Sequence, residues 1–231
     1  MPLLAIDTSA AISTAIVFDD DTAIERNLLE FRLHSEQLNV VIADLLAEAK
    51  LNPGDLTDVA VGTGPGPFTG LRIGIAAART MAFALDTPLY GVCSLDALAN
   101  QATESLNLAA GTNILVATDA RRREVYWATY QVPPTGDACT PPGLHQAGLI
   151  STSGPAVAKP TELSVPNQPS VIVGQGAVLY PDALPLTANS PTLPSAATLG
   201  RIANARANSG VAQPTEPRYL RRPDIHGVPS G

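Results

Sequence analysis

The chain has 231 residues, of which 45% are hydrophobic, 15% charged and 4% aromatic, and its formal net charge is −7. This length fits one large domain or two small ones with a substantial core. The negative charge argues against independent binding of nucleic acid, because Lys and Arg supply most of that affinity. The few aromatic residues argue against a base-stacking surface. If RNA is a ligand, we expect another component to hold it.

Two cysteines, Cys93 and Cys139, lie far apart in the sequence and indicate a reducing compartment rather than a disulfide framework. The N-terminal segment reaches Asp7 too early for the apolar part of a secretory signal. No apolar run in the sequence reaches membrane-spanning length. We therefore expect a cytoplasmic protein with no membrane segment.

The first elements are three predicted strands, at Leu3–Thr8, Ala11–Phe18 and Thr22–Phe31. The run Asp19-Asp20-Asp21 is a turn signal between the second and the third. Strands this close in the sequence are typical of an antiparallel meander.

The apolar period then changes from strand-like to helical. Residues Ser35–Lys50 carry apolar side chains three and four positions apart, which predicts an amphipathic helix ended by Asn52-Pro53-Gly54. Alternating segments follow: strand Val59–Gly62, helix Leu71–Leu85, strand Pro88–Cys93 and helix Leu95–Leu106.

A meander joined to a parallel strand–helix half describes the ribonuclease-H-like core, which nucleases share with actin-like phosphotransferases. The predicted fold class is therefore α/β, with a mixed sheet and helices on both faces. The fold alone does not select among the functions that it supports.

The composition shifts after about residue 100. Strands at Asn113–Thr118 and Glu124–Val132 are predicted to form a hairpin. Residues Pro133–Pro169 are rich in Pro, Gly, Ser and Thr and are predicted as long loops. A short strand at Val171–Gly174 and a helix at Ala196–Ala207 follow.

We divide the chain into three parts on this basis. Residues 1–100 form a first lobe, residues 101–195 a smaller second lobe, and residues 196–231 a helix that returns to the first lobe, followed by an extended tail.

A glycine-rich turn at residues 62–74 joins a buried strand to an apolar helix. It is not a Walker P-loop, because Gly70 is followed by Leu71 and Arg72 rather than by Lys and Ser or Thr. Pro65 and Pro67 also remove two N–H donors from any anion cradle. We therefore interpret the turn mainly as a tight packing corner, with weak anion binding as the alternative.

Asp7-Thr8-Ser9 ends the first strand, where open α/β sheets place ligands. An actin-like phosphotransferase would use this turn near phosphate, and a nuclease would use Asp7 as its first metal-binding carboxylate. Glu36 and Asp44 are poor candidates for the second carboxylate, and no suitable third acid follows the strand Val59–Gly62, where Thr63 and Gly64 stand instead. The nuclease hypothesis is therefore weak.

Other catalytic patterns are also poorly supported. His34 is followed one helical turn later by Leu38, so the His-x-x-x-His pair of a helical metal site is absent. His145 and His226 have no spacing relation to His34. The sequence also lacks the Gly-x-Ser-x-Gly motif of a serine hydrolase.

The predicted helix Leu71–Leu85 is apolar on nearly every side, so it must be covered on every side. One side fits the sheet, and another fits a second helix, either from the chain itself or from a partner. A pair of such helices meeting a copy would form a two-fold interface. The candidate interface residues are His34, Leu38, Val41, Ile42, Leu45, Gly70, Leu71, Gly74, Ile75, Ala78, Met81 and Ala82.

Several segments resemble the TsaB (YeaZ) family. They are Ala5-Ile6-Asp7-Thr8-Ser9, His34-Ser35-Glu36-Gln37-Leu38, residues 64–74, Asp119-Ala120-Arg121-Arg122 with Glu124-Val125-Tyr126, and the tail at residues 217–224. The resemblance is nearly full-length and is weakest from about residue 133 to residue 195. Pro67 departs from it, since many relatives have Ser there.

The resemblance implies a two-lobed actin-like ATPase fold and a role in making threonylcarbamoyladenosine at position 37 of tRNA. In that pathway a metal-binding TsaD subunit transfers the threonylcarbamoyl group to adenine, TsaB is its non-catalytic paralogue and scaffold, and the ATPase TsaE binds the pair. TsaD-like proteins carry paired histidines, whereas this chain has His34 and Leu38.

The resemblance therefore implies partners of the TsaD and TsaE types, a homodimer, and contact with tRNA only through the complex. It implies no catalytic residue and no cofactor in this chain, with ATP and metal belonging to the partner subunits. The alternatives are an actin-like nucleotide-binding phosphotransferase acting through Asp7, and a glycoprotease-like peptidase homologue.

Overall fold

The computed structural model describes residues 1–29, 35–134, 148–163, 165 and 169–221. The first sheet has five strands. The elements of this part of the chain are β1 (Leu3–Asp7), β2 (Ile12–Val17), β3 (Ala23–Leu28), α1 (Ser35–Ala49), a 3-10 turn (Pro53–Asp55), β4 (Asp58–Gly62), α2 (Phe68–Leu85) and β5 (Leu89–Val92).

The strand order of this sheet is β3-β2-β1-β4-β5. The first three strands are antiparallel neighbours, and β1, β4 and β5 are parallel, which confirms the predicted meander and parallel half. The third strand is shorter than predicted, since it ends at Leu28. The rest of its predicted range up to Phe31 reaches residues 30 and 31, which lie outside the described part of the chain.

The second sheet has four strands in the order β8-β7-β6-β9. The elements of this part are α3 (Ser94–Ser105), β6 (Asn113–Asp119), β7 (Val125–Gln131), β8 (Ile150–Ala158), a 3-10 turn (Pro160–Glu162), β9 (Val171–Val173), α4 (Gln175–Leu179) and α5 (Ala196–Asn208). The prediction of loops throughout Pro133–Pro169 is wrong, because β8 lies in this segment and pairs with β7.

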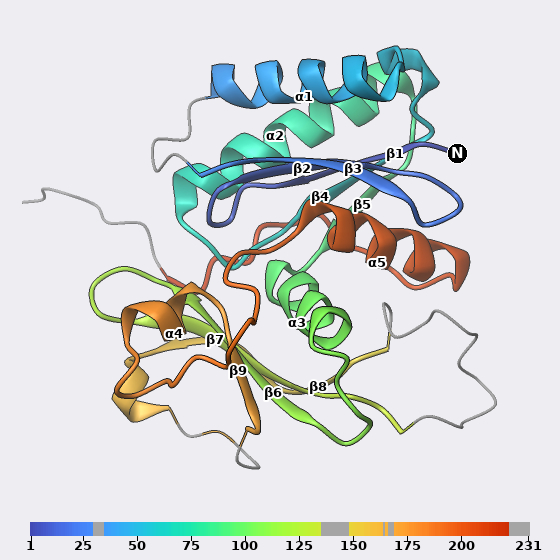
Figure 1. Ribbon diagram of the computed structural model, residues 1–231. Helices are drawn as coiled ribbons and strands as arrows, with labels where there is room; N and C mark the ends of the chain where they lie inside the picture. Colours follow the sequence, from blue (N-terminus) through green and yellow to red (C-terminus); the bar gives the residue numbers. More distant parts are fainter. Residues whose placement is uncertain (30–34, 135–147, 164, 166–168, 222–231) are drawn as a thin grey trace, which may run out of the picture.

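The helices cover the sheets in layers (Figure 1). Helices α1 and α2 lie on one face of the first sheet and α5 lies on the other. Helix α3 lies between the lobes and packs its apolar side on the second sheet, whose other face is covered by α4. The division at residues 100 and 195 stays a prediction.

Strand β1 is buried over its whole length, as expected for the central strand of a sheet that helices cover on both faces. Alternate side chains of a strand point to opposite faces. Leu4 and Ile6 accordingly join the core under α1 and α2, whereas Leu3 and Ala5 join the core under α5.

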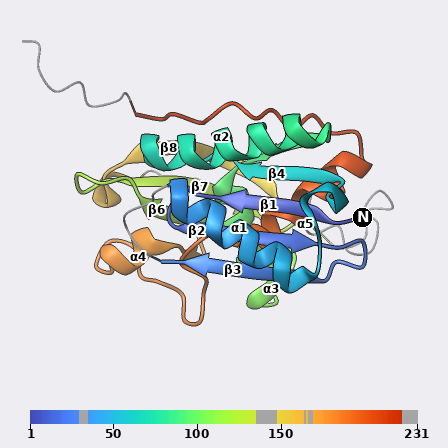
Figure 2. The same ribbon diagram turned by 90° about the horizontal axis from the view of Figure 1, so that it is seen from above.

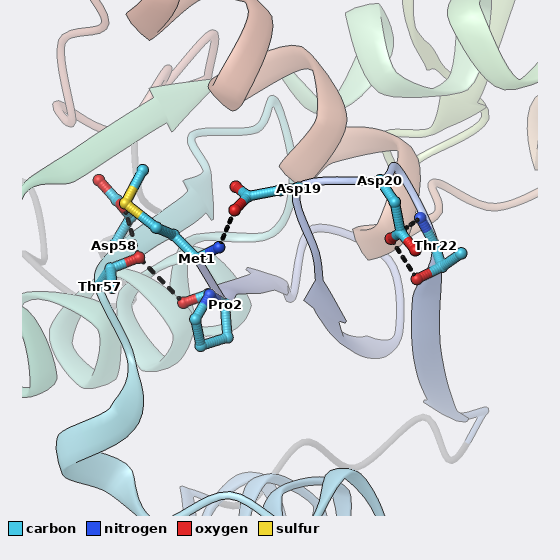
Figure 3. Close-up of polar contacts among 7 residues, drawn as sticks. All are labelled: Met1, Pro2, Asp19, Asp20, Thr22, Thr57 and Asp58. Atoms are coloured by element: carbon cyan, nitrogen blue, oxygen red, sulfur yellow. Dashed lines mark hydrogen bonds and ion pairs between the residues drawn. The ribbon is translucent and has the colours of Figure 1, made fainter.

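Polar contacts hold the start of the first sheet (Figure 3). The Met1 amino group is paired with Asp19, and the Thr57 hydroxyl lies within hydrogen-bonding distance of the Pro2 carbonyl oxygen, at 3.4 Å, and of the Asp58 carboxylate, at 2.8 Å. Asp20 accepts hydrogen bonds from the N–H and hydroxyl of Thr22, at 3.1 and 2.6 Å, and so shapes the turn between β2 and β3.

The C-terminal segment 211–221 (the tail) runs in an extended form beside α2 (Figure 2). The Gly91 N–H donates to the Gln213 carbonyl oxygen at 3.1 Å, and the Arg218 N–H donates to the Thr63 carbonyl oxygen at 2.8 Å. In the second lobe, Arg221 donates to the Ala120 carbonyl oxygen at 3.0 Å. The tail therefore joins the two lobes.

Candidate functional site

The glycine-rich corner between β4 and α2 contacts its own chain. A Cβ at Gly66 would lie 2.6 Å from the Ser9 carbonyl oxygen, and a Cβ at Gly74 would lie 2.3 Å from the Thr8 hydroxyl oxygen. The Thr8 hydroxyl donates to the Gly70 carbonyl oxygen at 2.8 Å. The absence of side chains here lets α2 lie directly on the turn after β1.

Asp7 is enclosed in this corner. It is 1% exposed, and its carboxylate accepts hydrogen bonds from the Ser9 N–H at 2.8 Å, the Ser9 hydroxyl at 2.6 Å and the Ser94 hydroxyl at 2.5 Å. Burial raises the pKa of Asp7, and the hydrogen bonds from Ser9 and Ser94 oppose that rise. Asp7 thus orders the first turn.

The corner does not fit a nucleotide phosphate held by Asp7-Thr8-Ser9. The glycine turn occupies the space beside Thr8 and Ser9, as the Cβ distances show. A cavity of about 290 Å³ is lined by residues that include Asp7 and Glu25, but Asp7 is 1% exposed and its carboxylate is enclosed by Ser9 and Ser94.

The fold divides the predicted interface residues between core and surface. Val41 and Met81 are half-buried. The members buried within the chain are Leu38, Ile42, Leu45, Gly70, Leu71, Gly74, Ile75, Ala78 and Ala82. The apolar side chains of this set pack in the core under the helices, and of the set only Leu38 also lines the outer groove described next. Gly74 faces Thr8 rather than a second helix. His34 lies outside the described residues.

A groove of about 580 Å³ lies on the outer side of α1 and α2. Its walls are Leu38, Asn39, Phe68, Thr69, Arg72, Ile73, Ala76, Ala77, Thr80 and Met81. Most of this lining is apolar or small, so the groove is suited to the apolar side of a helix rather than to a charged ligand.

Two exposed apolar side chains lie on the same helices. Phe83 of α2 is 90% exposed, and Val40 of α1 is 59% exposed. Phe83 follows Ala76 and Thr80 at helical spacing, so it continues the line of the groove along α2. The sequence analysis missed these residues because it followed the longer apolar stripe, which is the buried one. The sequence signal that could have identified Phe83 and Val40 is an apolar residue within the polar stripe, on the side of the helix opposite the buried stripe.

Helix α2 is also the one described helix that is long and apolar enough to cross a membrane. This property rests on length and composition alone, and core helices of soluble proteins share it. Six α2 residues are buried against the first sheet, and Arg72 and Arg79 lie on the exposed side.

Nothing in the described residues offers a metal or thiol centre. No group of three His, Cys, Asp or Glu side chains in the described ranges could hold a metal ion. Burial raises the pKa of Cys93 to about 12, so its reactive thiolate is disfavoured. Cys139, His145 and His226 lie outside the described ranges.

Comparisons with known proteins give consistent similarities. A family model described as TsaD, tRNA N6-adenosine threonylcarbamoyltransferase, matches residues 29–164. An uncharacterized protein of Mycobacterium tuberculosis is 40% identical over 227 residues, covering 96% of this chain and 92% of the relative. The tRNA threonylcarbamoyladenosine biosynthesis protein TsaB of Escherichia coli is 30% identical over 228 residues, covering 96% of this chain and 95% of the relative.

A solved structure shows the same architecture. YeaZ from Pseudomonas aeruginosa matches with a TM-score of 0.75 at 30% identity, covering 95% of this chain and 99% of that chain. The match confirms the two-lobed, actin-like fold class that the sequence predicts.

Proposed function

The chain belongs to the TsaB family of tRNA threonylcarbamoyladenosine biosynthesis proteins, and on that premise we propose that it is a non-catalytic scaffold subunit. In this proposal a TsaD-type catalytic subunit docks on the outer side of α1 and α2. The observation that carries the proposal is the groove of about 580 Å³, with the 90% exposed Phe83 on its line.

Helix-in-groove recognition explains why this surface fits a paralogue. A TsaD-type subunit of the same fold would present its own pair of helices, whose apolar ridges can enter the groove. An exposed aromatic residue is a typical anchor of such interfaces, because burying its ring contributes strongly to affinity. A second copy of this chain would compete for the same surface and form a two-fold homodimer.

The chemistry is assigned to the partners in this proposal. Leu38 is fully buried and apolar, so it cannot complete a metal site with His34. The carboxylate of Asp7 is enclosed by Ser9 and Ser94, which leaves the phosphotransferase alternative without an accessible acid. ATP and metal then belong to the TsaD-type and TsaE-type subunits of a cytoplasmic complex, and the chain contacts tRNA only through that complex.

Affinity for the TsaD-type subunit of the same organism tests the proposal. Ala76 and Thr80 are exposed and line the groove, so Ala76→Glu and Thr80→Arg would bury an unpaired charge on docking without disturbing the core. We expect affinity, measured by titration calorimetry, to fall at least about 30-fold, or about 2 kcal/mol.

The matched control is Ala110→Glu, which introduces the same charge at an exposed alanine in the turn before β6. It should bind as the wild type does. Wild-type affinity in both groove variants would refute docking on this surface. Turnover of ATP by the chain alone, lost in Asp7→Asn, would favour the phosphotransferase alternative.

A further inference from the structure

The outer side of α2 carries one stripe of exposed side chains. Its members follow one another three or four residues apart, which places them on one face of the helix, and they are Arg72, Ala76, Arg79 and Phe83. Arg72 and Ala76 line the groove of about 580 Å³ described above. The two arginines therefore belong to the surface on which the TsaD-type subunit is proposed to dock.

The charges of Arg72 and Arg79 are not neutralised within the described part of the chain. The arginines that form ion pairs with carboxylates there are Arg26, Arg121, Arg206 and Arg221. The chain as a whole has a net charge of −7, so the stripe on α2 is a local exception. An exposed arginine without such a partner attracts a carboxylate, because charge-assisted hydrogen bonds to carboxylates are among its strongest contacts.

The tail lies beside α2 and holds the side chain of Arg79 (Figure 2). The Nη2 atom of Arg79 donates to the carbonyl oxygen of Thr215 at 3.1 Å and to the hydroxyl oxygen of Thr215 at 3.2 Å. Both acceptors are neutral. They therefore orient the guanidinium group without cancelling its charge.

Arg72 is held from two directions. Its Nε donates to the Tyr219 hydroxyl oxygen at 3.4 Å, and its guanidinium carbon lies 3.8 Å from the centre of the Phe68 ring. The Phe68 and Tyr219 rings lie 4.9 Å apart, so the tail also supports the ring that contacts the arginine. Within the described residues, Nη1 of Arg72 and Nη1 of Arg79 have no hydrogen-bond acceptor. Both atoms are therefore available to a carboxylate.

The tail can orient these side chains because the first sheet holds it in place. The Gln213 carbonyl oxygen accepts from the Gly91 N–H at 3.1 Å. The Arg218 N–H donates to the Thr63 carbonyl oxygen at 2.8 Å. The Pro214 carbonyl group lies so close to Gly91 that a Cβ there would not fit. An arginine side chain that is oriented beforehand loses less conformational entropy when it binds.

We propose that Arg72 and Arg79, oriented by the tail, pair with carboxylates on the docking helix of the TsaD-type subunit. The two arginines are about two helical turns apart on α2, or about 10 Å. The matching carboxylates lie a similar distance apart, on a partner helix that runs along α2. Thr215 and Tyr219 are positioning residues, since they act through the arginines. The proposal rests on the proposed function, which supplies the partner.

Calorimetric titration of the full chain with the TsaD-type subunit, at about 50 mM and about 300 mM salt, tests the arginine contacts. We expect Arg72→Gln and Arg79→Gln each to bind at least about 3-fold more weakly at the lower salt concentration. Their affinity should also depend less on salt than that of the wild type, because each variant lacks one charge pair that salt screens.

The double variant Thr215→Val/Tyr219→Phe tests the role of the tail. It removes both hydroxyl acceptors and keeps the Tyr219 ring and every charge. We expect binding to weaken about 2-fold when the arginines are present, and not to weaken in the background of Arg72→Gln/Arg79→Gln. The same loss in both backgrounds would show that these tail residues act on the structure alone, and the positioning role would be wrong.

Arg201→Gln is the matched control for the loss of charge. Arg201 also donates from Nε to a neutral acceptor, the Asp21 carbonyl oxygen at 3.0 Å, but it lies in α5, on the opposite face of the first sheet. This variant should bind the partner with the affinity and salt dependence of the wild type. Wild-type affinity and salt dependence in both α2 variants would overturn the proposal. Tighter binding by them would also overturn it, in favour of a cationic partner surface.

The proposal can fail while the proposed function stands. If Ala76→Glu weakens binding and the two arginine variants do not, the subunit docks on the groove without these charge pairs. If none of the three variants weakens binding, both proposals are wrong. Sedimentation of the chain alone tests a second copy as the occupant. A homodimer that weakens in Arg79→Gln, with partner affinity unchanged, would assign the arginines to that copy and overturn the proposal.

Discussion

At the scale of single residues, the small side chains of the glycine corner serve contact within the chain. Gly66 and Gly74 let the turn and α2 approach the Thr8-Ser9 turn more closely than any side chain would allow. The sequence predicted a tight corner here, and the weak anion binding left open as its alternative lacks space beside Ser9.

Gly74→Ala tests this contact. The added methyl group would lie 2.3 Å from the Thr8 hydroxyl oxygen and force α2 away from β1, so we expect the free energy of unfolding to fall by about 1–3 kcal/mol. Gly54→Ala is the control, because a Cβ added at Gly54 would have no neighbouring atom within 4 Å. Urea denaturation measures both variants, and equal losses would contradict the packing argument.

Asp7 gives a prediction on pH. Its pKa is raised in the folded protein from an ordinary value of 3.8. Above pH 3.8 the unfolded chain releases this proton first, so stability falls as pH rises toward the folded pKa and stays lowered beyond it.

Asp7→Asn removes this titration and keeps an oxygen to accept the Ser9 hydrogen bonds. The stability of the variant relative to the wild type should therefore increase with pH from about pH 4 upward, in urea denaturation at a series of pH values. Parallel stability curves for the two proteins would contradict the raised pKa.

At the scale of elements, α2 has one side buried on the sheet and an outer side that we propose binds the partner. Ile75 is 5% exposed in the core, whereas Phe83 is 90% exposed. Ile75→Ala should cost about 2–4 kcal/mol of unfolding free energy, and Phe83→Ala less than about 0.5 kcal/mol. The order should reverse for partner affinity. A large stability loss in Phe83→Ala would show that its ring is covered by the chain itself.

The apolar period predicted these helices but not which side of each is buried by the chain itself and which is exposed. Leu71, Ile75 and Ala78 form the longest apolar stripe, and the first sheet covers them. Periodicity identifies a buried side without naming what buries it. Strand β8 was not predicted because Gly154 and Pro155 interrupt its alternation of apolar and polar residues. Helix α4 was not predicted because its five residues are too few to show a helical period.

At the scale of the molecule, the tail links the lobes. Removing residues 212–231 would leave the Gly91 N–H and the Thr63 carbonyl oxygen without these partners, so we expect a loss of about 2 kcal/mol in unfolding free energy. Removing only residues 222–231 leaves these contacts in place and is the control. Thermal unfolding compares the two, and equal midpoints would contradict the linking role.

The fold was largely predictable because strand and helix periods, and their order, restrict the chain to few topologies. The surface sites were less predictable. A pocket of about 190 Å³ between the lobes is lined by Phe68, Arg121 and Tyr219, which are distant in the sequence. Only the folded tail and the β6–β7 turn place them side by side.

Threonylcarbamoyl transfer to tRNA, measured with the TsaD-type and TsaE-type subunits and the synthase, tests most directly whether this chain supplies a docking surface and no chemistry. The account predicts that, at a partner concentration near the wild-type dissociation constant, transfer is lost in Ala76→Glu and retained in Asp7→Asn. Retained transfer in Ala76→Glu together with loss in Asp7→Asn would contradict it.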